Sequence, residues 1–141
     1  MASINQISAR IKTGNRGETA GTNGRIYLGI GGREFNLNLL GGSDFEAGMD
    51  QTFVLGEGAN SGPAPADNDP RSPHQLVTEN LDKYPIYVRF EPRTEDDRWD
   101  LDEISVTVNP GSAQIGFSAL GSGSHIWFGN KSTKIFYFGA N

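Results

Sequence analysis

The sequence predicts an all-β protein: an antiparallel two-sheet β-sandwich of about eight strands, with one long irregular insertion. The main observation is that apolar and polar residues alternate in short runs, separated by turn signals at intervals of roughly ten residues. In addition, nineteen glycines and seven prolines are spread over the whole length, which opposes long helices. No segment of helical length shows an apolar period of 3.6 residues.

Strands are expected wherever apolar residues recur at every second position. In chain order these positions are Ile7, Ala9 and Ile11; Ile26, Leu28 and Ile30; Phe35, Leu37 and Leu39; Phe53 and Leu55; Ile86, Val88 and Phe90; Ile104, Val106 and Val108; Ile115, Phe117 and Ala119; Ile126 and Phe128; and Ile135 and Tyr137. The last run, Ile135–Phe138, is apolar at every position. It therefore predicts an inner strand or, alternatively, a strand that contacts a second subunit.

The segment 56–85 interrupts this pattern and is expected to be a loop insertion in a single sandwich domain that covers residues 1–141. Its first half, up to Pro73, is rich in Gly, Pro, Ala and Asp, which is typical of an exposed excursion. Its second half, around Leu76 and Leu81, can form one short helical turn. A chain of 141 residues is long enough to bury about two-thirds of its surface around one core.

Composition excludes several functions. The absence of cysteine removes disulfides, thiolate nucleophiles and cysteine-ligated zinc. The formal net charge of −5, with no basic stripe, argues against nucleic-acid binding. This chain shows no signal peptide and no apolar run long enough for a transmembrane segment, so we expect a soluble protein, and its compartment stays open.

A polar, glycine-dense loop, residues 13–25, separates the first two predicted strands. Five of its residues offer side-chain oxygens close together: Asn15, Glu18, Thr19, Thr22 and Asn23. Such a loop either holds a hard cation, since Ca²⁺ prefers six to eight oxygen ligands, or forms a turn whose side chains cap the backbone.

Three local patterns occur in one order along the chain. They are Thr13-Gly14 with Ala20-Gly21-Thr22-Asn23 before Ile26-Tyr27-Leu28, then the segment 45–53 (FEAGMDQTF), then the segment 98–106 (RWDLDEISV). Together they resemble the PLAT (lipoxygenase-homology) domain family over about residues 7–138, apart from the insertion. The resemblance implies an eight-stranded sandwich that docks on lipid or protein surfaces, helped in some members by calcium at the loop tips.

By this resemblance, the candidate calcium ligands are Asn15, Gly21 through its carbonyl, Thr22, Asn23, Asp44, Glu46 and Asp50. The chain departs from the family pattern where Asn23 and Gln51 replace two expected aspartates. A site with fewer carboxylates would bind calcium weakly, at roughly 10⁻⁴–10⁻³ M. The alternative, a turn at Asn23-Gly24 without metal, remains open.

Three side chains are candidates for lipid or partner contact: Met49, Trp127 and Phe128. One exposed side chain buries too little apolar surface for strong docking, since roughly 100 Å² corresponds to about 2.5 kcal/mol. The negative net charge also opposes unaided membrane binding. The alternative is that Trp127 and Phe128 lie half in the core, while Trp99 is expected to be a core anchor.

Catalysis is not expected. The only histidines are His74 and His125, and no G-x-S-x-G motif is present. His125 is expected at a strand end on the surface, and the acidic run from Glu95 to Glu103 is interpreted as a solvated edge. The predicted function is therefore a non-catalytic binding module that recognises a protein or lipid surface through loops at one end. Alternatives are a structural subunit of a homo-oligomer and a carbohydrate-binding sandwich.

Overall fold

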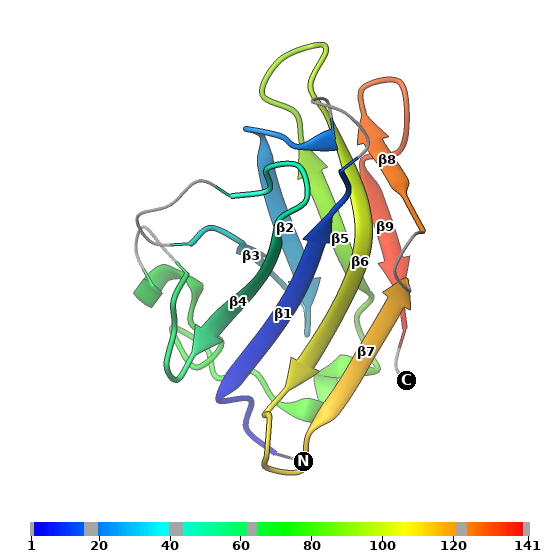
Figure 1. The fold of residues 1–141 in the computed structure, drawn as a ribbon. Helices are drawn as coiled ribbons and strands as arrows, with labels where there is room; N and C mark the ends of the chain where they lie inside the picture. Colours follow the sequence, from blue (N-terminus) through cyan, green and yellow to red (C-terminus); the bar gives the residue numbers. More distant parts are fainter. Residues whose placement is uncertain (1, 16–19, 40–43, 62–64, 121–123, 140–141) are drawn as a thin grey trace.

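The computed structural model describes residues 2–15, 20–39, 44–61, 65–120 and 124–139. The described chain folds into two antiparallel sheets packed face to face (Figure 1). Its nine strands are β1 (Gln6–Thr13), β2 (Arg25–Ile30), β3 (Arg33–Asn36), β4 (Asp50–Gly56), β5 (Ile86–Glu91), β6 (Arg98–Val108), β7 (Ile115–Leu120), β8 (Ile126–Gly129) and β9 (Ile135–Phe138). The predicted all-β sandwich is confirmed.

One sheet has the order β4-β1-β6-β7 with β8 also on β6, and the other has the order β3-β2-β5-β9. Strand β6 organises the first sheet because its 11 residues have room for two partners along one edge. Its first part, Arg98–Leu101, pairs with β8, and its later part, Ile104–Val108, pairs with β7. Strand β1 runs along its other edge.

The core lies between the sheets, where alternate residues of each strand point inward. Ile7, Ala9 and Ile11 of β1 face Ile26, Leu28 and Ile30 of β2, and all of these side chains are buried. Trp99 is fully buried at one end of this core. It packs against Phe45, Phe90 and Phe128 at ring-centroid distances of 5.6, 6.2 and 5.1 Å.

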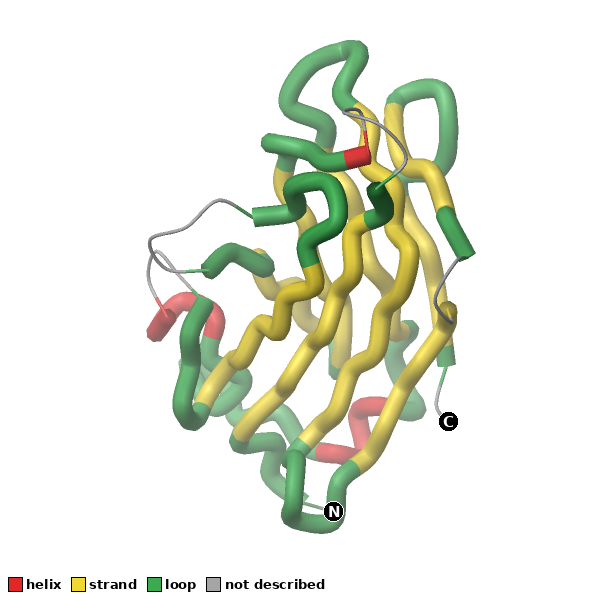
Figure 2. Tube along the Cα trace, in the orientation of Figure 1, coloured by secondary structure: helices red, strands yellow, loops and turns green. Residues whose placement is uncertain are grey.

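The segment between β4 and β5 carries two short 3-10 helices, η2 (Pro65–Asn68) and η3 (Thr78–Leu81) (Figure 2). The helical turn expected near Leu81 is therefore present. Much of the segment packs on the sandwich rather than extending into solvent, because Leu76 and Leu81 join the core. The Arg33 side chain also donates hydrogen bonds to the carbonyl oxygens of Asp67, Asp69 and Ser72.

Strand β9 is at the edge of its sheet and is not an inner strand, so that expectation was wrong. It pairs only with β5 among the described strands. Phe136 and Phe138 pack against the core, while Tyr137 is 58% exposed. The apolar residues at successive positions therefore belong to one core-facing side, with Phe136 and Phe138, and to an outer side, with partly buried Ile135 and exposed Tyr137. No helix in the described ranges is long and apolar enough to cross a membrane.

Candidate functional site

The three sequence patterns meet at one end of the sandwich, around Trp99. The Trp99 indole N–H donates to the hydroxyl of Thr13 at 3.0 Å, and both residues are buried. The next residue, Gly14, donates its backbone N–H to the carbonyl of Asp100 and accepts from the N–H of Gly48, both at 2.9 Å. The end of β1 is thereby tied to the start of β6 and to the loop before β4.

Gly21 lies where no side chain fits. A Cβ atom there would come within 2.7 Å of the Ala47 nitrogen and 2.8 Å of the Phe45 oxygen, both of them backbone atoms. The next N–H, that of Thr22, donates to the same Phe45 oxygen at 2.9 Å. Phe45 itself is buried with φ of 57°, a conformation rare for a bulky residue. The first loop, which contains Gly21 and Thr22, therefore packs through its backbone against the second loop, the segment 44–49 before β4.

The β5–β6 loop adds a third component through Asp97. The Thr22 hydroxyl donates to Asp97 Oδ1 at 2.6 Å and accepts from the Gly24 N–H at 2.8 Å. The other carboxylate oxygen, Oδ2, accepts the backbone N–H of Arg93 at 2.8 Å. Each carboxylate oxygen can accept a second bond, so Asp97 fixes the loops together and still has coordination capacity.

Two polar hollows adjoin at this end of the molecule. One, of about 460 Å³, contains Gly21, Thr22, Asn23 and Glu46 together with Asp97. The neighbouring hollow, of about 510 Å³, shares Thr22 and Asn23 and contains Asp44. The exposed side chain of Arg93 borders both hollows. Five of the seven predicted calcium ligands therefore lie in this pair of hollows, together with Arg93 and, in the larger hollow, Arg25.

Gln51, which stands where the family pattern has a carboxylate, is buried below the second loop. Its Oε1 accepts the Phe45 N–H at 2.9 Å, and its Nε2 donates to Asp44 Oδ1 at 3.2 Å. The second Asp44 oxygen accepts the Leu39 N–H at 2.9 Å. Burial raises the pKa of Asp44, and the two hydrogen bonds offset part of that rise. Gln51 thus supports the loop from below instead of facing the hollow.

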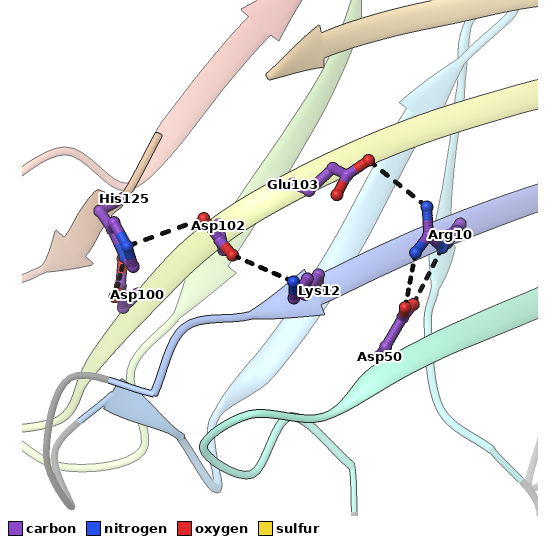
Figure 3. Close-up of polar contacts among 7 residues, drawn as sticks. All are labelled: Arg10, Lys12, Asp50, Asp100, Asp102, Glu103 and His125. Atoms are coloured by element: carbon purple, nitrogen blue, oxygen red, sulfur yellow. Dashed lines mark hydrogen bonds and ion pairs between the residues drawn. The ribbon is translucent and has the colours of Figure 1, made fainter. Parts of the chain in front are cut away.

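Two predicted ligands lie elsewhere. Asp50 is on the outer surface of the first sheet, where its carboxylate pairs with the Arg10 guanidinium at 2.6 Å (Figure 3). Arg10 lowers the pKa of Asp50, and Asp50 lines neither hollow. Asn15 is exposed near Gly48, outside both hollows. Glu18 and Thr19 of the first loop lie outside the described residues.

The three candidates for lipid or partner contact also lie in different surroundings. Phe128 is fully buried, with its ring centroid 5.1 Å from that of Trp99, so it is a core residue and not a surface contact. Trp127 is partly exposed on the opposite side of β8, with the Arg98 guanidinium 5.5 Å from its ring centroid. Met49 is partly buried, and its carbonyl accepts the Thr13 N–H at 2.8 Å.

A second polar cluster occupies the start of β6 (Figure 3). Asp100 is fully buried, and its Oδ2 lies 2.7 Å from His125 Nδ1. Its Oδ1 has no hydrogen-bond partner in the described part of the chain. Asp102 is also buried, 3.8 Å from both Lys12 Nζ and His125 Nε2. This part of the acidic run is therefore not a solvated edge, because β6 is a central strand flanked on both sides.

Within the described ranges, no group of three or more His, Cys, Asp or Glu side chains is arranged to hold a metal. We call the hollow of about 460 Å³ that contains Glu46 and Asp97 the loop hollow. A cation bound there would have to use these two carboxylates together with neutral oxygens. Such a donor set is compatible with calcium, which accepts carbonyl and amide oxygens.

No protein-family model matches the chain, and no curated protein matches it either. Solved structures do. The alpha toxin of Clostridium absonum superposes with a TM-score of 0.63 at 20% identity, over 96% of this chain and 31% of the toxin. The avian-strain Clostridium perfringens alpha-toxin gives 0.58 at 19% identity, over 99% of this chain and 30% of that chain. The fold is PLAT-like.

Lipoxygenases show the same fold in a longer protein. The coral 8R-lipoxygenase, described as having calcium activation via a C2-like domain, gives a TM-score of 0.58 at 17% identity. The match covers 96% of this chain and 17% of that enzyme. The present PLAT-like chain therefore spans a third or less of these neighbours, and at such identities the likeness establishes the fold alone.

Sequence reasoning missed Asp97 and Arg93. Asp97 is the third of three successive acidic residues, and nothing local distinguishes it from Glu95 and Asp96. Its role follows from the hydrogen bond to Thr22, which is 75 residues away along the chain. Arg93 is similarly defined by the hollows that it borders.

Proposed function

We propose that this chain is a non-catalytic module that docks on a lipid surface through the loops at the Asn23–Asp97 end, with a weak calcium requirement. The observation that carries the proposal is the convergence of the three loops on one polar hollow, fixed by the Thr22–Asp97 hydrogen bond. Backbone packing at Gly21 holds the loops in this arrangement.

Calcium has a specific role in this proposal. Glu46 and Asp97 bring two negative charges to the hollow, and these repel anionic headgroups. A calcium ion held by them, by Asn23 and by the Gly21 carbonyl would reverse that repulsion and leave coordination positions for phosphate oxygens. Arg93 attracts the same headgroups but also repels the cation, which keeps the calcium affinity low.

The test is co-sedimentation with phosphatidylcholine–phosphatidylserine vesicles, in several millimolar calcium or in excess chelator. We expect pelleting with calcium that falls in chelator, in Glu46→Gln and in Arg93→Ala. Arg71→Ala is the matched control, since it removes one exposed arginine from the β4–β5 segment, outside both hollows. No pelleting, or pelleting unaffected by all of these changes, would refute lipid docking through this end.

Calcium binding is measured separately, by the melting temperature in calcium and in chelator. A ligand at 100-fold excess over its Kd stabilises the folded state by about 2.7 kcal/mol. If melting does not shift in several millimolar calcium while vesicles still pellet the protein, the docking proposal stands and its calcium requirement is wrong. A surface protein as partner, without lipid, predicts a calcium shift with no vesicle binding.

A further inference from the structure

The four tyrosines of the chain, Tyr27, Tyr84, Tyr87 and Tyr137, all gather on the outer side of the second sheet. On β2 and β5 the neighbouring residues Ile26, Leu28, Ile86 and Val88 are buried, so Tyr27 and Tyr87 point outward. Tyr137 on β9 is paired with Tyr87 across the strands, and their ring centroids are 5.7 Å apart. Tyr84 and Tyr137 are the exposed large hydrophobic side chains of the described chain, at 49% and 58%.

Glycines allow these rings to lie close to the sheet. A Cβ at Gly29 would come within 2.1 Å of the Tyr87 ring, so that ring covers the backbone of β2. Gly32 has φ of 88°, and a Cβ there would lie 3.0 Å from the Tyr84 ring. The Tyr87 and Tyr84 rings therefore lie close to the sheet, and the Tyr137 ring meets the Tyr87 ring edge-on, at an interplanar angle of 64°. We call the four tyrosines with Glu34 and Arg89 the tyrosine face.

Polar groups lie among the rings and remain accessible. The Tyr87 hydroxyl donates to Glu34 at 2.6 Å, and the Arg89 guanidinium donates to both Glu34 oxygens at 2.8 and 2.9 Å. The same guanidinium lies 4.2 Å from the Tyr27 ring centroid. The Arg89 and Glu34 side chains are 32% and 33% exposed, so they are held in place yet can bond a ligand.

A hollow of about 300 Å³ has Tyr84 and Tyr87 in its wall, together with Glu34 and Pro85. This is at the small end of the range for ligand pockets. It is large enough for one ring of a small polar molecule. Aromatic walls with a carboxylate beside them provide both an apolar surface and a hydrogen-bond acceptor.

The charges of this side of the sheet identify the class of ligand. Arg25 and Arg89 are balanced by Glu34 and Glu91, and Arg89 lies 3.7 Å from Glu91. A nucleic acid requires excess positive charge, and a lipid chain requires aliphatic surface. A neutral sugar instead has an apolar C–H side that stacks on an aromatic ring and hydroxyls that bond carboxylate and guanidinium groups. We infer that the tyrosine face binds a neutral carbohydrate chain.

The test is native affinity electrophoresis of the full chain in gels containing hydroxyethyl cellulose, xylan, galactomannan or soluble starch, with anionic carboxymethyl cellulose as the charge control. We expect at least one neutral polysaccharide to retard the wild-type protein. Stacking one face of a tyrosine ring removes roughly 60 Å² of apolar surface from water, which corresponds to about a ten-fold change in affinity. Tyr84→Ala and Tyr137→Ala should each weaken binding by about that factor.

Trp127→Ala is the matched control because it removes a partly exposed aromatic ring from the other sheet. It should leave retardation unchanged, and circular dichroism with the unfolding midpoint checks that each variant is folded. Absence of retardation in all four neutral gels would overturn the inference. So would retardation that persists in the Tyr84→Ala/Tyr137→Ala double variant, or that occurs only with the anionic polymer. Vesicle binding by the loop end is independent of this outcome.

Discussion

The hydrogen bond between Trp99 and Thr13 gives the sharpest test of how the loop end is built. The Trp99 indole N–H is 3.0 Å from the Thr13 hydroxyl, and the two residues are 0% and 1% exposed. Thr13→Val keeps the shape of the side chain and removes its oxygen. The indole N–H is then buried without its partner, and water has no access to replace it.

An unsatisfied buried donor of this kind costs about 1–3 kcal/mol of folding free energy. With an unfolding entropy near 2.1 cal/mol/K per residue, a chain of this length loses about 3 °C in melting temperature for each kcal/mol. We therefore expect Thr13→Val to lower the melting temperature by about 3–10 °C. The free energy of unfolding is measured by urea denaturation, and the midpoint by thermal circular dichroism.

Two further variants separate the hydrogen bond from packing. Thr13→Ser keeps the hydroxyl and removes a methyl group, so it should cost about 1 kcal/mol, as the loss of one core methyl typically does. In a Trp99→Phe background the donor is absent, and Thr13→Val should then be neutral or stabilising. The reasoning is refuted if Thr13→Val is as stable as the wild type, or if its cost is the same in the Trp99→Phe background.

Three other outcomes follow from single contacts. Gly21→Ala forces a Cβ against the backbone of the second loop and should destabilise the fold by about 1–3 kcal/mol. Gly139→Ala is the control, because a Cβ there has open space and should be neutral. Equal urea midpoints for the two variants would contradict the packing at Gly21. Asn23→Asp adds a carboxylate to the loop hollow and should tighten calcium binding by about ten-fold. The readout is a larger calcium-induced shift in melting temperature than in the wild type. An unchanged shift would remove Asn23 from the site. Burial and the hydrogen bond to Glu34 raise the pKa of Tyr87 to about 12, so the Tyr87 phenol should ionise near that pH in an ultraviolet titration. Because the pKa of Tyr87 in the folded state exceeds its ordinary value of 10.0, the contribution of this group to stability is complete below pH 10.0 and is lost as pH rises toward 12. Glu34→Gln should bring that ionisation to lower pH, and no change on this substitution would contradict the assignment.

Most of the fold follows from local pattern. The alternation of Ile7, Ala9 and Ile11 predicts β1 because a strand places alternate residues on opposite sides. The same alternation predicts β2 and β5, whose inward residues meet those of β1 in one core. Strand β6 begins at Arg98, earlier than the apolar alternation from Ile104 predicts, because its early residues Asp100 and Asp102 are polar. Burial of those carboxylates beside His125 and Lys12 depends on strands that are distant in sequence.

The site was only partly predictable. Gly21, Thr22, Asn23 and Glu46 do lie together, as the motif order indicates. Asp50 does not join them, although it is only four residues beyond Glu46. Strand pairing begins at Asp50, so its side chain points to the outer surface and reaches Arg10. A displacement of one residue along a strand reverses the side to which a side chain points.

The sequence alone therefore determined the fold class, the strand positions and the composition of the first loop, because these depend on residues close together in the chain. Tertiary structure decided which oxygens share a hollow and which side of a sheet gathers the tyrosines. The loop hollow depends on Thr22 meeting Asp97, and the tyrosine face depends on β9 pairing with β5. Both contacts join segments about 50 residues or more apart, and their geometry follows from strand order and register, which local periodicity does not encode.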